Sequence, residues 1–371
     1  MTRVAVAMSG GVDSAVAAAL LVSEGHEVVG FTMNLWPAWV PPGEGGGCCG
    51  IGAAEDARSV ARALGIRHYV LNLRAEFERD VIGYFAGEYA RGRTPNPCIA
   101  CNRAIKFDLL LRRVGGMGID LLATGHYARV DRAPGGRYRL LRAADARKDQ
   151  SYVLAGLTQA QLARVRFPVG DYAKPQIREI ARRHGLCVAD KADSQEICFV
   201  PRGDYAAVVE RFEPGALRPG PIYTVDGTYL GQHQGLARYT VGQRRGLGIG
   251  AGRPWYVARI DAAGNALIVG DAQSVRCPEL VAEDVNWIAV PGLAEPRPAA
   301  VRIRHASADV PAVIIPAAGG RVIVRFDEWP RAAAPGQAIA FYDGNVVLGG
   351  GMIAESALPG EVGRAVVATR T

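Results

Sequence analysis

Short apolar runs alternate with helix-like stretches from the N-terminus to about residue 205, which is the pattern of a parallel β-sheet covered by helices. Strands are predicted at four of these runs, namely 3–8, 26–33, 67–73 and 119–125. Helices are predicted at three stretches that a glycine closes, namely 14–25, 53–65 and 174–185. The pattern therefore indicates an α/β domain in this part of the chain.

The pattern changes near residue 205, where a segment rich in proline and glycine begins. Short β-branched runs separated by turn residues follow, at 223–231, 254–270, 300–306, 321–326 and 338–351. Such runs are typical of small antiparallel sheets or of a β-barrel. A weaker break at 278–282 divides this part again, so we expect three domains, at 1–205, 206–280 and 281–371.

The size and composition of the chain support a globular protein with more than one domain. Its 371 residues exceed one ordinary core, and 49% of them are hydrophobic. The sequence shows neither a signal segment nor an apolar run of membrane-spanning length. We therefore expect a soluble, cytoplasmic protein without a membrane partner.

The net charge and the cysteines narrow the classes of function. A formal charge of +7 modestly favours a nucleic-acid partner, the alternative being a solvated basic surface. An odd number of cysteines disfavours a framework of structural disulfides and directs attention to thiol chemistry or metal binding. The seven cysteines are Cys48, Cys49, Cys98, Cys101, Cys187, Cys198 and Cys277.

The segment SGGVDS, which begins at Ser9, lies between a predicted strand and a predicted helix. Backbone N–H groups and a helix N-terminus would then surround one small concavity, a geometry that binds phosphate. Gly10 and Gly11 lack the Cβ atoms that would block a close approach, and Asp13 can hold a magnesium ion that bridges pyrophosphate oxygens. Ser9 and Ser14 can donate hydroxyl hydrogen bonds. The alternative is a tight strand-to-helix turn that Asp13 and Ser14 cap.

A loop within residues 91–111 carries the pair Cys98 and Cys101 and is expected to end at a helix N-terminus. The positive end of the helix dipole would there lower the pKa of the Cys101 thiol. The two cysteines could form half of a zinc site, a redox pair or two ligands of an iron–sulfur cluster, or they could simply be packed side chains. A third cysteine, Cys198, would by itself be interpreted as a core residue.

Five motifs, in one order along the chain, give it a family resemblance. They are SGGVDS, the RTPNPxxxCNxxIKF pattern of residues 93–107, ATGHYAR at 123–129, KDQSYVL at 148–154 and DSQEICF at 193–199. Together they closely resemble the bacterial tRNA-specific 2-thiouridylases, which belong to the PP-loop ATP pyrophosphatase superfamily. Segments 239–248 and 335–351 extend the likeness, so that it covers nearly the whole chain.

The resemblance implies a fold and a reaction. The fold would be α/β, with an N-terminal PP-loop domain of the adenine nucleotide α-hydrolase-like type, a small central mainly-β domain and a C-terminal antiparallel β-barrel that contacts tRNA. Members of the family replace O2 of the wobble uridine of certain tRNAs by sulfur. ATP adenylates that oxygen and releases pyrophosphate, which turns the oxygen into part of AMP, a good leaving group. A sulfur-donor protein supplies the sulfur as a cysteine persulfide.

The same resemblance implies which residues do this chemistry. Cys198 would carry the persulfide and Cys101 would be the nucleophile that releases the product, leaving a disulfide between the two. Lys148 and Asp149 would lie at the reacting centre, where the lysine compensates phosphate charge. The residues expected to bind tRNA are His126, Lys148, Asp149, Gln150 and Gln337. The residues expected to bind ATP are Ala7, Met8, Ser9, Gly10, Gly11, Val12, Asp13, Ser14, Met33 and Gly125.

Position 98 departs from the family pattern, because many members have aspartate there and this chain has cysteine. Cys98, Cys101 and Cys198 could therefore bind a 4Fe–4S cluster with one iron open to sulfide. We favour the persulfide route, for which Cys101 and Cys198 suffice. Cys48 and Cys49 are interpreted as incidental.

Two further functions stay open at this stage. One is a PP-loop ligase or amidotransferase that acts on a small molecule, which would have no use for the paired cysteines. The other is a non-catalytic, iron–sulfur protein that binds RNA, against which the intact SGGVDS and KDQSY segments argue.

Overall fold

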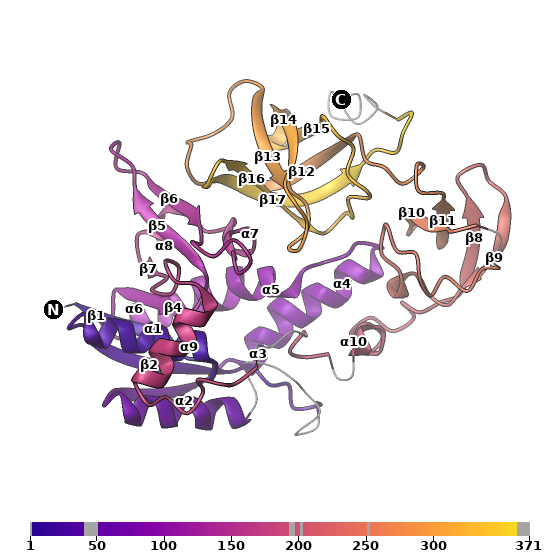
Figure 1. Ribbon diagram of the computed structural model, residues 1–371. Coiled ribbons are helices and arrows are strands. Elements are labelled where there is room, and N and C mark those ends of the chain that lie inside the picture. The colour runs from indigo at the N-terminus through magenta and orange to yellow at the C-terminus, as the bar shows by residue number, and fades with distance from the viewer. Residues whose placement is uncertain (1, 41–50, 193–196, 201–202, 251–252, 362–371) are drawn as a thin grey trace. The chain divides into compact units, whose positions relative to one another are not determined.

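The computed structural model describes residues 2–40, 51–192, 197–200, 203–250 and 253–361 (Figure 1). The chain forms two compact units. Unit 1 comprises Met1–Ile82, Pro97–Asp204 and Asn345–Val347, and unit 2 comprises Gly83–Asn96, Tyr205–Gly344 and Leu348–Thr371. The chain thus passes between the units five times, after residues 82, 96, 204, 344 and 347. Cys48, Cys49 and residues 193–196 of the DSQEICF motif lie outside the described residues.

A parallel sheet of five strands organises unit 1, in the order β3-β2-β1-β4-β7. The strands β1 and β2 are almost wholly buried, which explains why they form continuous apolar runs in the sequence. The strand order reverses at β1, because β2 lies on one side of it and β4 on the other. The bounds are β1 Arg3–Ala7, β2 Glu27–Asn34, β3 Arg67–Asn72, β4 Leu121–Thr124 and β7 Val165–Arg166.

Helices connect these strands, and α1, α2 and α9 share one apolar cluster with the sheet. The predicted glycines Gly25, Gly65 and Gly185 follow these three helices with positive φ angles of 82°, 66° and 63°, which confirms how the helices end. The helical segments of unit 1 are α1 Val12–Ser23, α2 Ile51–Ala63, α3 Arg74–Phe77, η1 Glu78–Gly83, α5 Pro97–Ala100, η2 Cys101–Leu110, α6 Leu111–Gly115, α7 Ser151–Leu154, α8 Gln159–Leu162 and α9 Lys174–Arg183.

An antiparallel hairpin of β5 Ala128–Arg132 and β6 Tyr138–Arg142 follows β4 in unit 1. Val346 and Val347 pair with β6. The sequence pattern did not predict this hairpin, because most residues of both strands are only partly buried and charged side chains interrupt the apolar ones.

Unit 2 begins with two helices and a small sheet. The helices are α4 Tyr84–Ala90 and α10 Tyr205–Phe212, which contact each other. The sheet has the order β10-β11-β8-β9, with bounds β8 Gly220–Thr224, β9 Tyr229–His233, β10 Tyr256–Asp261 and β11 Ala266–Gly270. Its two hairpins are antiparallel as predicted, whereas β11 and β8 pair in parallel. The connection over 234–255 is long enough to bring the second hairpin beside the first in that direction.

A closed barrel of six strands completes unit 2, in the order β12-β15-β14-β13-β16-β17, with β12 also paired to β17. Its interior holds apolar side chains such as Val301, Ile314, Val324, Phe341 and Ile353. Closure leaves the barrel without a free edge. The bounds are β12 Glu279–Trp287, β13 Arg297–Arg302, β14 Val310–Pro316, β15 Val322–Phe326, β16 Ala338–Asp343 and β17 Val346–Ser356, with short 3₁₀ turns η4 Leu236–Arg238 and η5 Ala318–Gly320 elsewhere in the unit.

The fold class expected from the sequence is confirmed: a parallel-sheet N-terminal domain, a small central β domain and a C-terminal antiparallel barrel. The change of unit after Asp204 lies next to the predicted break at residue 205. The division into three domains stays a prediction. Within the described part of the chain, no helix combines the length and the apolar character that crossing a membrane requires.

Candidate functional site: a phosphate-binding loop and its partners

The carboxyl ends of β1 and β4 meet where the strand order reverses, which is where open parallel sheets bind their ligands. β1 leads into the SGGVDS loop, and β4 leads into Gly125. A Cβ atom on Gly125 would lie 2.6 Å from the carbonyl carbon of Asp13 and from the nitrogen of Ser14. The structure thus brings Gly125 against the loop with which it was predicted to bind ATP.

The SGGVDS loop is held in shape by its own polar groups. The Ser14 hydroxyl accepts a hydrogen bond from the Ser9 nitrogen at 3.1 Å and donates one to the Gly11 carbonyl oxygen at 3.1 Å. The Thr32 hydroxyl donates to the Met8 carbonyl oxygen at 2.8 Å, which anchors the start of the loop to β2. These bonds fix the backbone of the loop before any ligand is bound.

Gly10 and Gly11 have different places in the loop. Gly10 has a φ of +68°, and a Cβ atom there would lie 2.3 Å from the Ala53 carbonyl oxygen, so only glycine fits. Gly11 is the N-cap of α1, and no side chain of the described residues caps that helix. The first N–H groups of α1 are therefore not used by a cap, which favours the phosphate-binding interpretation over a capped turn.

Asp13 is bound by two groups from distant parts of unit 1. Lys174 Nζ donates to both carboxylate oxygens, at 2.7 and 2.9 Å, and the Tyr127 hydroxyl donates to Oδ1 at 2.6 Å. The side chains of Lys174 and Asp13 are 11% and 29% exposed, so the ion pair is largely shielded from water. Coulomb attraction is stronger in such a place than between surface charges.

The sequence analysis missed both Lys174 and Tyr127. A signal for Lys174 was present: it is the first residue of α9, where a positive charge opposes the helix dipole. A lysine at that position indicates an anionic partner, which turns out to be Asp13, 161 residues away in the chain. No local pattern could have singled out Tyr127.

Tyr127 also ties the KDQSYVL segment to the loop. Its backbone nitrogen donates to Gln150 Oε1 at 2.9 Å, and its carbonyl oxygen accepts from the Gln150 nitrogen at 2.8 Å. Gln150 was expected to contact tRNA. In the structure it is hydrogen-bonded to the backbone of Tyr127, whose hydroxyl binds Asp13. The loop and the KDQSYVL segment are thus parts of one hydrogen-bonded network.

An open cavity of about 590 Å³ lies beside this network. Five of its seven lining residues are Lys or Arg, which suits it to an anion. Lys148, predicted at the reacting centre, lies on its wall, and Lys174 both lines the cavity and holds Asp13. The lining residues are Asp145, Arg147, Lys148, Lys174, Pro175, Arg178 and Arg182.

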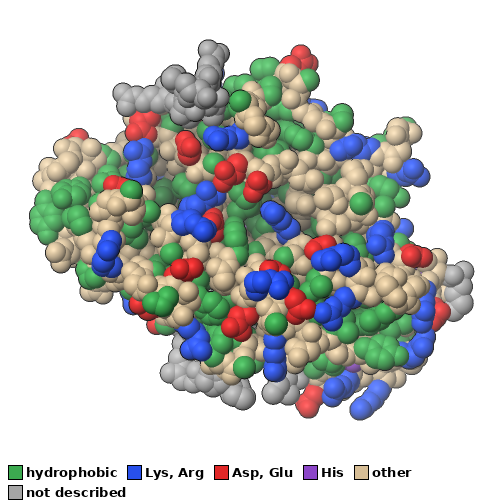
Figure 2. All heavy atoms as spheres, turned by 180° about the vertical axis from the view of Figure 1, so that it is seen from behind, with side chains coloured by type: hydrophobic (Ala, Val, Ile, Leu, Met, Phe, Trp, Pro, Cys, Tyr) green, Lys and Arg blue, Asp and Glu red, His purple; other side chains and the backbone are tan. Residues whose placement is uncertain are grey.

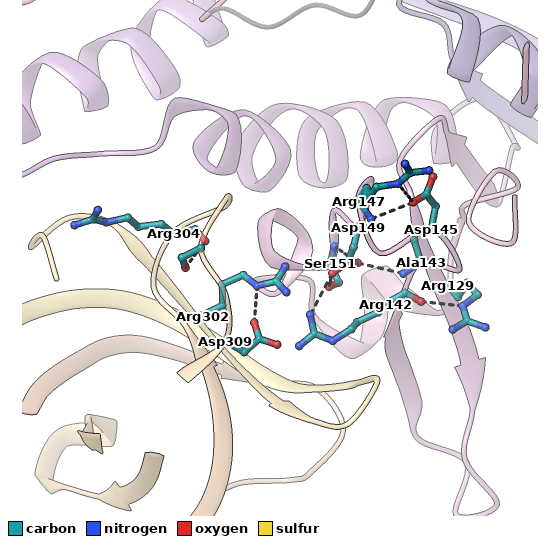
Figure 3. Close-up of polar contacts among 11 residues, drawn as sticks. Arg129, Arg142, Ala143, Asp145, Arg147, Asp149, Ser151, Arg302, Arg304 and Asp309 are labelled. Carbon is teal, nitrogen blue, oxygen red and sulfur yellow. Dashed lines mark hydrogen bonds and ion pairs between the residues drawn. The ribbon is translucent and has the colours of Figure 1, made fainter. Parts of the chain in front are cut away.

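Asp145 and Asp149 organise the segment that carries Lys148 (Figure 3). Burial alone would raise the pKa of Asp145, but hydrogen bonds from the Arg147 and Lys174 nitrogens, at 3.0 and 3.5 Å, keep the pKa below its usual value. Asp149 is buried, and its carboxylate accepts hydrogen bonds from the Ala143 nitrogen and from the Ser151 nitrogen and hydroxyl at 2.9–3.1 Å. These hydrogen bonds fix the backbone around Asp149, and its expected place at the reacting centre stays a prediction.

His126 and Met33 flank the loop. Met33 is buried near the end of β2. His126 is partly exposed, and its Nδ1 lies 2.7 Å from the Thr124 hydroxyl. Its ring packs against Phe107 and Phe167, with centroids 5.7 and 6.1 Å apart. Burial, and secondarily the Lys106 charge, hold the pKa of His126 well below its usual value, so the ring is neutral at pH 7.

Cys98 and Cys101 lie on one continuous helical segment. It begins with α5 at Pro97 and continues through η2 and α6. The helix therefore starts four residues before Cys101 rather than at it, and Cys98 occupies the first turn. Asn102 Nδ2 donates to the Val153 carbonyl oxygen at 3.2 Å, which ties Cys101 to the KDQSYVL segment.

Cys198 lies in a turn and is partly exposed. The next residue, Phe199, is buried and packs edge-to-face on Phe77 of α3, with ring centroids 5.8 Å apart. Because α3 also contacts η2, Cys101 and Cys198 lie on elements with a common neighbour. Nowhere in the described part of the chain do three His, Cys, Asp or Glu side chains lie close enough together to hold a metal ion.

Gln337 belongs to unit 2, where it holds the RTPNP segment. Its Nε2 donates to the Thr94 carbonyl oxygen at 2.9 Å, and the Thr94 nitrogen donates to the Pro335 carbonyl oxygen at 2.7 Å. The expected contact of Gln337 with tRNA stays a prediction, and the amide nitrogen already has this partner.

Charges of both signs are intermixed on one face of the molecule (Figure 2). On the face drawn in Figure 2, Lys and Arg side chains stand among Asp and Glu side chains. In unit 2, Arg302 pairs with Asp309 at 2.7 Å and Arg304 donates to the Ala332 carbonyl oxygen at 2.7 Å (Figure 3). On the face in Figure 2, charge alone marks no separate surface for a nucleic acid.

Known proteins resemble the chain along nearly its whole length. Residues 2–202, 209–271 and 278–353 match the families described as tRNA methyl transferase HUP domain, tRNA methyl transferase PRC-barrel domain and aminomethyltransferase beta-barrel domain. The tRNA-specific 2-thiouridylase MnmA of Symbiobacterium thermophilum is 51% identical over 95% of this chain and 92% of its own length. The protein of the same name from Heliobacterium modesticaldum is 50% identical over 94% and 92%. A solved 4-thiouridine synthetase–RNA complex with bound ATP covers 57% of this chain and 50% of its own, at 18% identity and a TM-score of 0.35, which is too weak a likeness to support an argument.

Proposed function

The chain belongs to the tRNA-specific 2-thiouridylase family, and we propose that it converts the wobble uridine of tRNA into 2-thiouridine with consumption of ATP. The observation that carries this proposal is the identity of about half of all residues with relatives of that name over 95% of the chain. The proposal is further supported by the loop at the point where the strand order reverses, and by Cys101 and Cys198, whose segments both contact α3.

The first step is adenylation of the base. Uracil O2 attacks the α phosphorus of ATP, the bond to the bridging oxygen breaks, and pyrophosphate leaves with that electron pair while N3 of the base loses its proton. Ala7–Ser14 offer backbone N–H groups to the phosphates, and Met33 and Gly125 complete the nucleotide site. Lys148 compensates the charge that develops at the phosphate.

Asp13 is the residue that would hold Mg²⁺ in this step. Mg²⁺ commonly binds through one or two carboxylates together with substrate phosphates and several waters. A single carboxylate beside a phosphate-binding loop fits this requirement, with no further acidic residue needed. The ion would supply charge neutralisation for the phosphates, and Asp13 would orient it.

The second step replaces oxygen by sulfur. The terminal sulfur of a persulfide on Cys198 attacks C2 of the adenylated base, and AMP leaves with the oxygen. The Cys101 thiolate then attacks Cys198 Sγ and breaks the bond between that atom and the sulfur on C2 of the base. A Cys101–Cys198 disulfide forms, and the 2-thiouridine anion that leaves takes up a proton. A dithiol reductant restores the thiols, and a sulfur-donor protein reloads Cys198, which fits a reducing, cytoplasmic location.

Binding of tRNA is assigned to His126, Lys148, Gln150 and Gln337 by the family pattern, with Asp149 fixing the segment that carries two of them. A neutral His126 ring beside two aromatic rings can stack on a base that has left the anticodon stack. A 4Fe–4S cluster on Cys98, Cys101 and Cys198 fits the structure poorly, because these thiols do not form a ligand set among the described residues. We therefore derive no step through a cluster.

The test is mass analysis of the wobble nucleoside after incubation with unmodified tRNA, ATP and a persulfide donor. We expect 2-thiouridine together with equimolar AMP and pyrophosphate, and we expect release of pyrophosphate to depend on tRNA. Release of pyrophosphate at the same rate without tRNA, with no thiolated nucleoside, would instead indicate a small-molecule ligase.

A further inference from the structure

Lys174 lies where a positive charge is unfavourable unless an anion binds it. It begins α9, where the helix dipole disfavours a cation, and its side chain is 11% exposed. Its Nζ atom spans both oxygens of Asp13, and it lines the basic cavity beside the loop. Burial and the helix dipole both destabilise the positive charge, and the charge is stable there only because an anion compensates it.

The anion that Lys174 now holds is a poor neighbour for a nucleotide. Asp13 lies in the first turn of α1, within the loop that the proposed function gives to the triphosphate of ATP. A carboxylate without a cation would repel the phosphates there. Lys174 neutralises the carboxylate, and the Tyr127 hydroxyl donates a hydrogen bond that orients it.

We propose that Lys174 is a further catalytic residue of the adenylation step, whose ammonium group exchanges between Asp13 and the β and γ phosphates. Asp13 is the residue that would hold the divalent cation of the nucleotide, and Lys174, released from Asp13, contacts the phosphate oxygens. The ammonium group stays on the pyrophosphate as the bond between the α phosphorus and the bridging oxygen breaks, because the negative charge on that oxygen increases. It returns to Asp13 when pyrophosphate leaves. This inference rests on the proposed use of ATP.

The surroundings of Lys174 fit this exchange better than a purely structural ion pair. A structural pair needs no open space, whereas Lys174 borders a cavity of about 590 Å³ whose other basic residues include Arg147 and Lys148. The Asp145 carboxylate accepts a hydrogen bond from the Lys174 backbone nitrogen at 3.5 Å, which holds the start of α9 in place while the side chain moves.

Binding of inorganic pyrophosphate to the full-length protein, in buffer with a chelator and no divalent cation, tests the proposal. Asp13→Asn removes the carboxylate and leaves the ammonium group to the phosphates, so we expect affinity for pyrophosphate to rise about tenfold or more. The gain should vanish in the double variant Asp13→Asn, Lys174→Gln. The Asp13→Asn, Lys174→Arg variant should keep most of it, because it retains the charge.

The controls separate this exchange from other effects. Arg183→Gln, on the same helix and outside the cavity, should leave affinity for pyrophosphate unchanged, and circular dichroism should show that every variant is folded. A gain that persists without Lys174, or no gain in Asp13→Asn, overturns the proposal. If the wild-type protein forms 2-thiouridine while either result is found, only the role of Lys174 is wrong. If it forms none, the proposed function itself fails.

Discussion

The nucleotide loop and the thiol-bearing segments of unit 1 are built in different ways. The loop is fixed by its backbone, through the positive φ of Gly10, the bonds of Ser14 and the buried partners of Asp13. Cys101 and Cys198 are partly exposed, and their chain neighbours Asn102 and Phe199 anchor the segments that carry them. A phosphate site gains from rigidity, whereas a thiol that receives sulfur from another protein has to be reachable.

The largest effect is expected at the thiols. Cys101→Ser and Cys198→Ser should each lower the rate of thiolation by at least about 1,000-fold, because a nucleophile cannot be replaced by its neighbours. Affinity for tRNA should change little, since each substitution replaces one sulfur atom by oxygen on a partly exposed side chain. Mass analysis of the wobble nucleoside and a filter-binding assay measure the two quantities.

Cys187→Ser is the matched control, because Cys187 is an exposed free thiol in the same unit. It should thiolate at the wild-type rate. Loss of tRNA affinity in both Cys101→Ser and Cys198→Ser would mean that these cysteines are structural, and the contrast between the two regions would then disappear.

The next effect separates the two glycines of the loop. Gly10→Ala should lower the free energy of unfolding by about 1–3 kcal/mol or more, because its φ of +68° is strained for alanine and the new Cβ would meet the Ala53 carbonyl oxygen. Gly11→Ala meets nothing closer than the Ser9 hydroxyl oxygen at 3.5 Å, so stability should hold. Its affinity for ATP should nevertheless fall, because the methyl group blocks approach of the phosphates. Thermal unfolding measures the stability of both variants, and titration with ATP measures their affinity. If Gly11→Ala binds ATP as tightly as the wild type, the phosphates do not bind at this loop.

A smaller effect is expected from His126, which follows Gly125 beside the nucleotide loop and packs on Phe107 of the helical segment that carries Cys98 and Cys101. The pKa of His126 is lower in the folded protein than in the unfolded chain, where it is about 6.5. As the pH falls below about 6.5, the unfolded chain therefore binds a proton more readily than the folded protein. The stability that the neutral ring contributes is therefore complete above that pH and is lost below it, by at most about 1.4 kcal/mol per pH unit. His126→Gln should flatten this dependence between pH 7 and pH 5.5. Urea denaturation at both pH values measures it, and an unchanged slope contradicts the prediction.

The smallest effect is expected at Cys98. Cys98→Asp restores the residue that many family members have, so thiolation should stay within about threefold of wild type, since two thiols suffice for the persulfide route. Iron and sulfide analysis after anaerobic purification should show no stoichiometric cluster in either protein. A bound cluster in the wild type that Cys98→Asp loses together with activity would restore the iron–sulfur alternative.

Local patterns predicted the frame of unit 1 well, and they did so for physical reasons. Strands β1, β2 and β4 are largely buried in a parallel sheet and therefore appear in the sequence as apolar runs, and glycines with positive φ end α1, α2 and α9. The contacts of Tyr127 and Lys174 with Asp13 could not be predicted. These two residues lie 114 and 161 positions away along the chain, and only the tertiary fold brings them next to Asp13. The place of Asp149 at the reacting centre stays a prediction, because its carboxylate binds the Ala143 and Ser151 nitrogens and the Arg142 guanidinium, and no local pattern indicates those partners.

The crossing of the chain between units has a practical consequence for anyone who wishes to study the ATP chemistry in isolation. Residues 83–96 belong to unit 2, where Tyr89 packs against Tyr205 with ring centroids 5.0 Å apart and Phe85 is fully buried. A polypeptide truncated after residue 204 would keep these aromatic side chains and lose the surface that covers them. Exposed rings of this kind promote aggregation. A fragment that ends at residue 204 should therefore aggregate, although the change of sequence pattern at residue 205 suggests a domain boundary there.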